Sequence, residues 1–233
     1  TATFGPPMAA TWPIAWEEDM AELKARVATL QAALESHGIS KSADWDYCDP
    51  GVADDVIGQH GRYCDLTVIG PELTSSPQLR AKTLEGALFS SARPVLLLPG
   101  SAKPSLSPRR ILVGWDASQE AARAVRESLE MLRSADQVTV AVVDPEPGLL
   151  GHGEEPGADL AAYLARHGAK VTVDRLPREG RATADVLRRH VVDTAADLLV
   201  LGAYGHSRLR DWILGGVTRS MVAEPPVPVF MAR

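Results

Sequence analysis

The residues in this sequence with the clearest potential for chemistry are closely spaced glycines near its C-terminal end. They follow an apolar run, residues 198–201, whose branched side chains predict a buried strand. The set consists of Gly202, Gly205, Gly215 and Gly216. Glycine lets a backbone approach a ligand closely, and the free N–H groups at a helix N-terminus attract anions. A strand that ends in glycine, then a basic loop and a Gly-Gly step into a helix, predicts a phosphate-binding site.

Polar side chains near this glycine set are further candidates. Asp116 ends a predicted strand, where its carboxylate can accept a ribose hydroxyl or hold magnesium. The alternative is that it caps the helix that begins near Ser118. Arginine suits phosphate through its planar guanidinium, although charges on an exposed loop are usually solvated. The basic residues in and just after the loop are His206, Arg208, Arg210 and Arg219.

The composition argues against several classes of protein. The 233 residues carry a formal net charge of −6, whereas a nucleic-acid partner normally requires a basic face. No apolar run approaches the roughly 18–20 residues of a membrane helix, and the first residues lack a signal-peptide pattern. The two cysteines, Cys48 and Cys64, are too few for a disulfide scaffold. We therefore expect a cytoplasmic protein with neither a nucleic-acid nor a membrane partner.

The sequence also lacks the motifs of several enzyme classes. It contains no Gly-x-x-x-x-Gly-Lys-Ser/Thr segment, and Gly151-His152-Gly153 lacks the spacing of a dinucleotide fingerprint. No set of residues resembles a nucleophile with its base, and neither cysteines nor histidines have metal-ligand spacing. We therefore predict no catalytic residue and no metal-binding residues.

Apolar runs alternate along the chain between the periods of strands and helices. In the C-terminal part the predicted strands are 111–116, 138–143, 170–176, 197–201 and 227–231, with helices at 118–133, 158–167, 182–195 and from about 217. In the N-terminal part the predicted helices are 17–37, 51–61 and 78–91, with strands at 43–48, 65–70 and 94–99. Between the parts, residues 100–108 are rich in Gly, Ser and Pro and read as a linker.

Three landmarks recur in the two parts at a nearly constant separation. His37-Gly38 matches His167-Gly168 at an offset of 130. Residues 65–70 match 197–202 at an offset of 132, and the Pro-Val steps at 94 and 228 match at 134. A slowly drifting offset indicates duplication with small insertions. The alternative is that both parts reached a common α/β pattern independently.

This alternation predicts an α/β protein with two doubly wound, mostly parallel open sheets and helices on both faces. We expect one domain at residues 1–100 and a second, complete domain at 109–233. The first is incomplete at its N-terminal side, because it lacks counterparts of strand 110–115, helix 118–133 and strand 138–143. Ligands of such sheets bind beyond the carboxyl ends of the strands, where strand order reverses, so the candidates in the second domain should converge on one crevice.

The glycine spacing, followed by Val217-Thr218, resembles the signature of the universal stress protein family. The early Asp116-Ala117-Ser118 and the closing strand 227–231 are similar to it as well. The resemblance covers residues 109–233 by signature and 17–99 by fold pattern. It implies a tandem universal stress protein with a Rossmann-like, adenine-nucleotide α-hydrolase-like fold. The two domains would pair within the chain, and a homodimer of the whole chain is left open.

The resemblance also implies roles for individual residues. In nucleotide-binding members the glycines at positions 202, 205 and 215 surround the phosphates and ribose of ATP. The next residue is normally Ser or Thr but is Gly216 here, which removes a hydrogen bond worth about 1.5–3 kcal/mol. Val142 matches the position that contacts adenine, and Trp115 is bulkier than the expected small residue. The remaining implied nucleotide-binding residues are Asp116, Ala117, His206, Val217 and Thr218.

The first domain offers no comparable site. No Gly-x-x-Gly follows Gly70, and Glu85 stands beside Gly86, where its charge would repel phosphate. We therefore expect the first domain to have a structural role, pairing with the second.

Together these observations predict a stress-response protein that binds an adenine nucleotide in its second domain. The expected ligand is ATP, with or without magnesium, and the expected role is that of a regulator or switch rather than an enzyme. The main alternative is a dimerising scaffold in which Gly216 and Trp115 mark a lost pocket. A third hypothesis is an enzyme of the wider adenine-nucleotide α/β superfamily, such as a nucleotide transferase or hydrolase.

Overall fold

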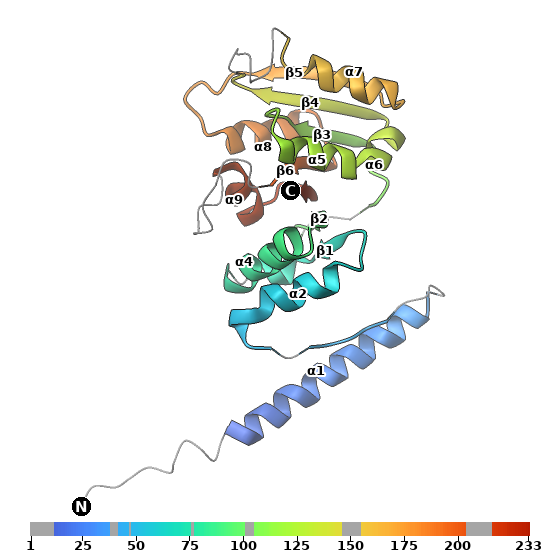
Figure 1. Cartoon of the computed structure of the whole chain (residues 1–233), viewed down its shortest axis with the longest axis vertical. Coiled ribbons are helices and arrows are strands. Elements are labelled where there is room, and N and C mark those ends of the chain that lie inside the picture. Colours follow the sequence, from blue (N-terminus) through green and yellow to red (C-terminus); the bar gives the residue numbers. More distant parts are fainter. Residues whose placement is uncertain are drawn as a thin grey trace, which may run out of the picture. The chain divides into compact units, whose positions relative to one another are not determined.

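The structure of this chain is a computed structural model that describes residues 12–37, 42–46, 48–75, 77–100, 105–145, 155–203 and 216–233. The chain divides into two compact units, Thr1–Asp49 and Pro50–Arg233. Figure 1 shows the elements of both.

The first unit consists mainly of helix α1 (Trp12–Glu35), as the sequence predicts. The side chain of Gln31 links this helix to the chain that follows, because its Oε1 accepts the N–H of Ala43 at 2.8 Å. The predicted strand 43–48 is not formed in residues 42–46 and 48. A strand requires a neighbouring strand for its hydrogen bonds, and no described strand pairs with this segment.

The second unit is built on one seven-stranded sheet with the order β1-β2-β7-β6-β3-β4-β5. The strands are β1 (Thr67–Ile69), β2 (Val95–Leu97), β3 (Arg110–Gly114), β4 (Gln137–Val143), β5 (Val171–Leu176), β6 (Leu198–Gly202) and β7 (Val229–Ala232). All neighbouring strands run parallel except β2 and β7. This confirms the prediction of an α/β fold with a mostly parallel open sheet.

The sequence predicts two sheets, whereas the described strands form one. Strands β2 and β7 pair antiparallel, with Leu96 opposite Phe230, and so join the two parts edge to edge. Each of these strands ends its own parallel set and would otherwise expose a row of unpaired N–H and C=O groups. The predicted linker, residues 100–108, connects two strands of the same sheet. The two compact units therefore divide after Asp49 and not at this linker. The domain limits 1–100 and 109–233 stay a prediction.

Helices cover both faces of the sheet. The helices on one face are α2 (Ala53–Gly61), α3 (Pro71–Ser75), α4 (Pro77–Glu85), α8 (Thr183–Asp193) and α9 (Gly216–Ala223), together with the 3-10 turn η2 (Pro50–Val52) beside α2 and the π-helical turn η3 (Gly86–Ser90). Those on the other face are α5 (Gln119–Glu127), α6 (Leu129–Ser134) and α7 (Ala158–Arg166). Successive strand residues alternate between the two apolar clusters, since Leu199 and Leu201 belong to the first and Val200 to the second.

The predicted helix 118–133 is divided into α5 and α6 at Ser128. The buried hydroxyl of Ser128 donates to the carbonyl oxygens of Ala124 at 2.8 Å and Val125 at 3.3 Å. A serine hydroxyl that bonds back to the preceding turn competes with the regular helix pattern, which explains the break.

The strand pairs β1–β2 and β6–β7 share one register. Thr67 lies opposite Val95, and Leu199 lies opposite Val229, which are the same pairs at offsets of 132 and 134. The N–H of Thr67 donates to the carbonyl of Pro94 at 3.0 Å, and the N–H of Leu199 donates to that of Pro228 at 3.0 Å. The sequence repeat therefore extends to the hydrogen bonds of the sheet.

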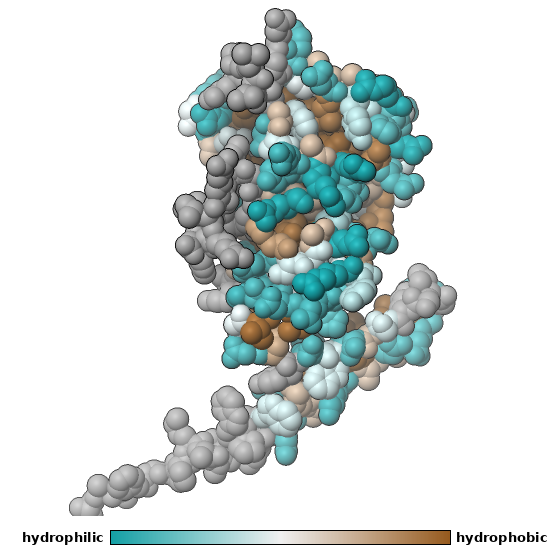
Figure 2. All heavy atoms as spheres, in the orientation of Figure 1, coloured by the Kyte–Doolittle hydropathy of each residue, from teal (hydrophilic) through white to brown (hydrophobic). Residues whose placement is uncertain are grey.

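The described surface is mixed in polarity. Figure 2 shows hydrophilic residues over most of the visible face of the second unit, with smaller hydrophobic areas among them. Among the described helices, none is long and apolar enough to cross a membrane.

Candidate functional site

The sheet has one point at which strand order reverses. Strands β3 and β6 are parallel neighbours, with Gly114 opposite Leu201. From β3 the chain proceeds outward to β4 and β5 on one side, and it then returns to β6 and β7 on the other. Ligands of open α/β sheets bind beyond the carboxyl ends of the strands at such a point. In Figure 1 the β4 arrow points to the side of the sheet on which α9 lies.

The turn after β3 fixes the carboxylate of Asp116 at this edge. Its Oδ1 accepts the N–H of Ser118 at 3.0 Å and the Ser118 hydroxyl at 2.6 Å. Ser118 is the N-cap of α5, and its Oγ accepts the N–H of Ala121 at 3.1 Å. Ala117 between them has a φ of 59°, which costs energy for a residue with a side chain. Ser118 is therefore the cap of α5, and Asp116 holds this capping residue instead of capping the helix itself; the same bonds hold its carboxylate at the carboxyl end of β3.

Gly202 ends β6 against the first turn of α5. A Cβ added at this position would lie 2.7 Å from the carbonyl carbon of Glu120 and 2.8 Å from the Cα of Ala121. Real Cβ atoms do not approach backbone so closely, so this strand end can contact α5 only with glycine. Close packing accounts for Gly202 whether or not a ligand binds beside it.

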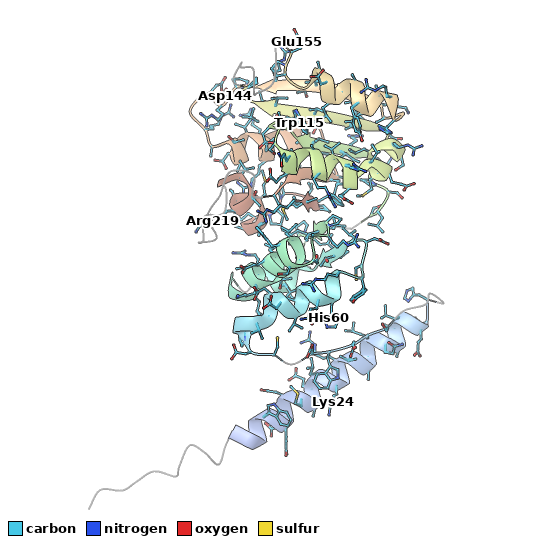
Figure 3. The ribbon with its side chains drawn as sticks, viewed as in Figure 1. Lys24, His60, Trp115, Asp144, Glu155 and Arg219 are labelled. Atoms are coloured by element: carbon cyan, nitrogen blue, oxygen red, sulfur yellow. The ribbon has the colours of Figure 1, made fainter. Side chains whose placement is uncertain are left out.

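The start of α9 differs from Gly202. Among the described residues, no atom lies within 4 Å of a Cβ added at Gly216. Val217 is partly buried against the first apolar cluster, and Thr218 is only 5% exposed. Arg219, labelled in Figure 3, is exposed on the same turn. Other predicted site residues lie outside the described residues, namely Gly205, His206, Arg208, Arg210 and Gly215.

Two residues that the family resemblance places near the adenosine pocket lie against the second apolar cluster. Val142 on β4 is fully buried there, and Trp115 is partly buried. Contact of Val142 with adenine stays a prediction. Trp115, labelled in Figure 3, is partly buried against the same cluster, and its N–H donates to the carbonyl of Ala141 at 2.9 Å. The ring extends the core at the carboxyl end of β3.

A clamp that sequence reasoning did not predict, formed by Asp144 and Arg178, joins the loops after β4 and β5. The Oδ1 of Asp144 accepts the backbone N–H of Arg178 at 3.1 Å, and its Oδ2 accepts the guanidinium Nε at 2.9 Å. These bonds, the backbone one first, hold the pKa of Asp144 below its usual value. The two residues are 34 positions apart, so no local motif could have revealed the pair.

A second unpredicted residue, Arg188 on α8, holds the C-terminal half of α9. Its guanidinium donates to the Oγ of Ser220 at 2.9 Å and to the carbonyl of Glu224 at 3.3 Å. Basic side chains commonly satisfy the last carbonyls of a helix. Arg188 thereby fixes the helix whose first turn is open.

The glycines of the N-terminal part serve packing. A Cβ at Gly86 would clash with the backbone carbonyl oxygen of Asp54 and would lie 2.9 Å from the Cβ of Ile57. Lys82, one turn earlier, pairs with the Asp54 carboxylate at 2.9 Å. Gly86 therefore lets η3 lie directly on α2.

Among the described residues, no group of three or more His, Cys, Asp or Glu side chains could hold a metal ion. Cys48 and Cys64 are free thiols.

Comparison with known proteins gives a family match for the C-terminal part of the chain. The model of the universal stress protein family matches residues 108–233. The chain belongs to the universal stress protein family. A curated relative, universal stress protein Slr1230 of Synechocystis sp. PCC 6803, is 27% identical over 157 residues, which are 64% of this chain. The matched residues cover 50% of that relative, so the chain spans about half of its length.

Two solved structures share the fold over nearly the whole chain. A universal stress protein from Archaeoglobus fulgidus has a TM-score of 0.70 at 20% identity, covering 94% of this chain and 79% of that one. A protein from Pseudomonas aeruginosa described as a universal stress protein has a TM-score of 0.56 at 17% identity, covering 90% and 77%. At these identities the likeness concerns the fold.

Proposed function

We propose that this universal stress protein binds an adenine nucleotide, ATP with or without magnesium, between the carboxyl ends of β3 and β6. The observation that carries the proposal is the coincidence of two features at the point where strand order reverses. One is the fixed carboxylate of Asp116. The other is the open first turn of α9, which begins on the same edge because β6 and β7 are parallel.

The chemistry of these groups fits the two ends of a nucleotide. The N–H groups and the dipole of the first turn of α9 favour a phosphate. The carboxylate of Asp116 can accept a ribose hydroxyl. Because the described residues offer no three-ligand metal site, magnesium would reach the protein bound to the nucleotide phosphates. On this proposal the protein is a cytoplasmic regulator or switch in stress responses and carries no catalytic residues.

The N-terminal part is, on the same proposal, a degenerate copy of the domain, which makes the chain a tandem protein. The support is the common register of β1–β2 and β6–β7, together with the antiparallel pairing of the two last strands, β2 and β7. On this proposal the two copies pair within one chain, and a homodimer of the chain is an additional state to be tested by mass.

Nucleotide binding is tested by titrating the full chain with ATP, with and without magnesium, in a calorimeter, and by native mass spectrometry of the purified protein. We expect binding of ATP that GTP does not match. The decisive variants are Gly216→Ser and Gly216→Ala, because no atom of the described residues lies within 4 Å of a Cβ added at this position. The serine variant should bind at least about tenfold more tightly, since it restores a hydroxyl donor to a charged group. The alanine variant controls for helix propensity and should leave affinity near that of the parent. No heat at millimolar ATP in any variant would reject the proposal.

The second candidate function is a scaffold without a nucleotide. It is favoured by the full explanation of Gly202 through packing and by the bulk of Trp115 at the end of β3. On this reading neither Gly216→Ser nor Trp115→Ala creates ligand-dependent thermal stabilisation, and the measurable activity is capture of a protein partner.

A further inference from the structure

Helix α8 lies beside α9, the helix to which the proposed function assigns the phosphates (Figure 1). Arg188 on α8 makes three hydrogen bonds to the C-terminal half of α9. Its Nη2 donates to the carbonyl oxygen of Ser220 at 2.5 Å and to the hydroxyl of Ser220 at 2.9 Å. Its Nε donates to the carbonyl oxygen of Glu224, the residue after α9, at 3.3 Å. One planar guanidinium thus holds two carbonyl groups that lie one helical turn apart.

Arg188 is suited to hold α9 because its own side chain is fixed. Its Nη1 pairs with the Oδ1 of Asp185, one turn earlier on α8, at 3.0 Å. The side chain of Arg188 is 23% exposed, and a guanidinium at this end of α9 also matches the negative end of the helix dipole. The three bonds to α9 are therefore made by a side chain that has little freedom to leave them.

The next residue, Arg189, shows that this contact belongs to one position and not to α8 as a whole. The side chain of Arg189 is 71% exposed, and its described ion pair, with Asp193 of the same helix, is 3.8 Å long. An exposed pair of this length contributes little to the fold. The two arginines carry the same charge on the same helix and differ in whether they hold α9, which makes Arg189 a matched control.

The orientation of a short helix at one end determines the position of its other end. The eight residues of α9 extend about 12 Å at a rise of about 1.5 Å per residue. A tilt of about 5° at the Arg188 end therefore moves the first-turn N–H groups by about 1 Å. Hydrogen bonds from N–H groups to a charged oxygen are short, about 2.7–2.9 Å, so a shift of this size weakens them. Phosphate binding at the first turn thus depends on how the last turn is held.

We propose that Arg188 is a positioning residue for the nucleotide phosphates, and that it sets how strongly the protein prefers ATP to adenosine. It acts through α9, because its bonds fix the direction in which the first turn presents its N–H groups. The carboxylate of Asp116 lies at the end of β3 and is held by Ser118, so the ribose contact is independent of Arg188. This inference rests on the proposed nucleotide site and adds a residue that determines selectivity for the phosphorylated ligand.

The experiment compares Arg188→Gln with Arg189→Gln in the full chain, since both remove one positive charge from α8. Calorimetry measures the Kd of ATP, of adenosine, and of tripolyphosphate, which carries phosphates without a nucleoside. Arg188→Gln should weaken ATP and tripolyphosphate at least about tenfold, because a misplaced first turn loses a hydrogen bond to a charged group. It should leave adenosine within about twofold of the parent chain, because separate contacts act independently. Arg189→Gln should leave all three ligands within about twofold, because its ion pair is exposed.

Arg188→Lys is the second variant, and it separates the charge of Arg188 from its geometry. Lysine keeps the positive charge but cannot span the two carbonyl groups with a planar fork, so ATP should weaken at least about threefold. Circular dichroism of each variant checks that the chain is folded.

The inference is overturned, while the proposed function stands, if the parent binds ATP and either Arg188 variant retains the parent's affinity. The same holds if Arg188→Gln weakens ATP and adenosine by one common factor, or if Arg189→Gln weakens ATP as much as Arg188→Gln does. If the parent binds none of the three ligands, the proposed nucleotide site itself is rejected, and the inference falls with it.

Discussion

The N-terminal and C-terminal parts of this sheet use the same residue type at related places for opposite purposes. In the N-terminal part Gly86 brings η3 onto the backbone of α2. In the C-terminal part no described atom lies within 4 Å of a Cβ added at Gly216, the first residue of α9, and close packing occurs at Gly202 instead. A glycine count alone does not distinguish a ligand loop from a packing contact. What separates them is whether a Cβ would meet backbone or solvent.

The largest expected effect tests this contrast directly. Gly202→Val and Gly86→Val should each lower the free energy of unfolding by about 3 kcal/mol, the upper range for overpacking, because the neighbouring atoms are backbone and cannot move aside. Gly216→Val should change it by no more than about 0.5 kcal/mol, since the position is exposed and no described atom lies within 4 Å of the added Cβ. Urea denaturation of the three variants measures the difference. Equal losses at all three positions would contradict the contrast.

A smaller effect is expected at the turn between β3 and α5, which has no described counterpart in the N-terminal part. Ser118→Ala removes the cap of α5 and should cost about 1 kcal/mol of unfolding free energy. It also removes the hydroxyl bond to the Asp116 carboxylate and leaves the bond from the Ser118 N–H, so ATP affinity should fall if the nucleotide lies there. Ser134→Ala, whose hydroxyl donates to the Met131 carbonyl on the exposed end of α6, is the control and should change neither quantity. Unchanged unfolding in Ser118→Ala would show that the cap is not needed.

The smallest expected effect is a pH dependence shared by both parts. The pKa of Asp54 is lowered by its hydrogen bond with Lys82, and that of Asp144 by its bonds with the Arg178 backbone and guanidinium. A carboxyl whose folded pKa lies below its unfolded value stabilises the fold above the unfolded pKa of about 3.9, and this stabilisation disappears as the pH falls through the folded value.

Thermal unfolding between pH 7 and pH 3 checks this expectation with Asp54→Asn and Asp144→Asn. Each variant should unfold at a lower temperature than the parent at pH 7, and the difference should narrow toward pH 3. Asp193→Asn is a suitable control, because its only described ion pair, with Arg189, is exposed and 3.8 Å long. A gap that widens on acidification would show that the two lowered pKa values do not govern this range.

Local pattern determined much of this protein in advance. The sheet strands of the second unit lie where apolar runs of branched residues predict them, because burial on both faces of a parallel sheet demands such runs. The offsets between matching landmarks anticipated the common register of β1–β2 and β6–β7. The signature around Asp116 and the glycines indicated the family before any geometry was known.

Tertiary structure decided what spacing along the chain does not encode. The union of the strands into one sheet depends on the β2–β7 edge, which joins residues more than a hundred positions apart. The contact of Gly202 with α5, the Asp144–Arg178 clamp and the hold of Arg188 on α9 are all long-range as well. The sequence determined which residues could stand at an edge or a turn. Only the packing of distant elements determined that the space at Gly202 is filled by α5, whereas no described atom approaches a Cβ at Gly216.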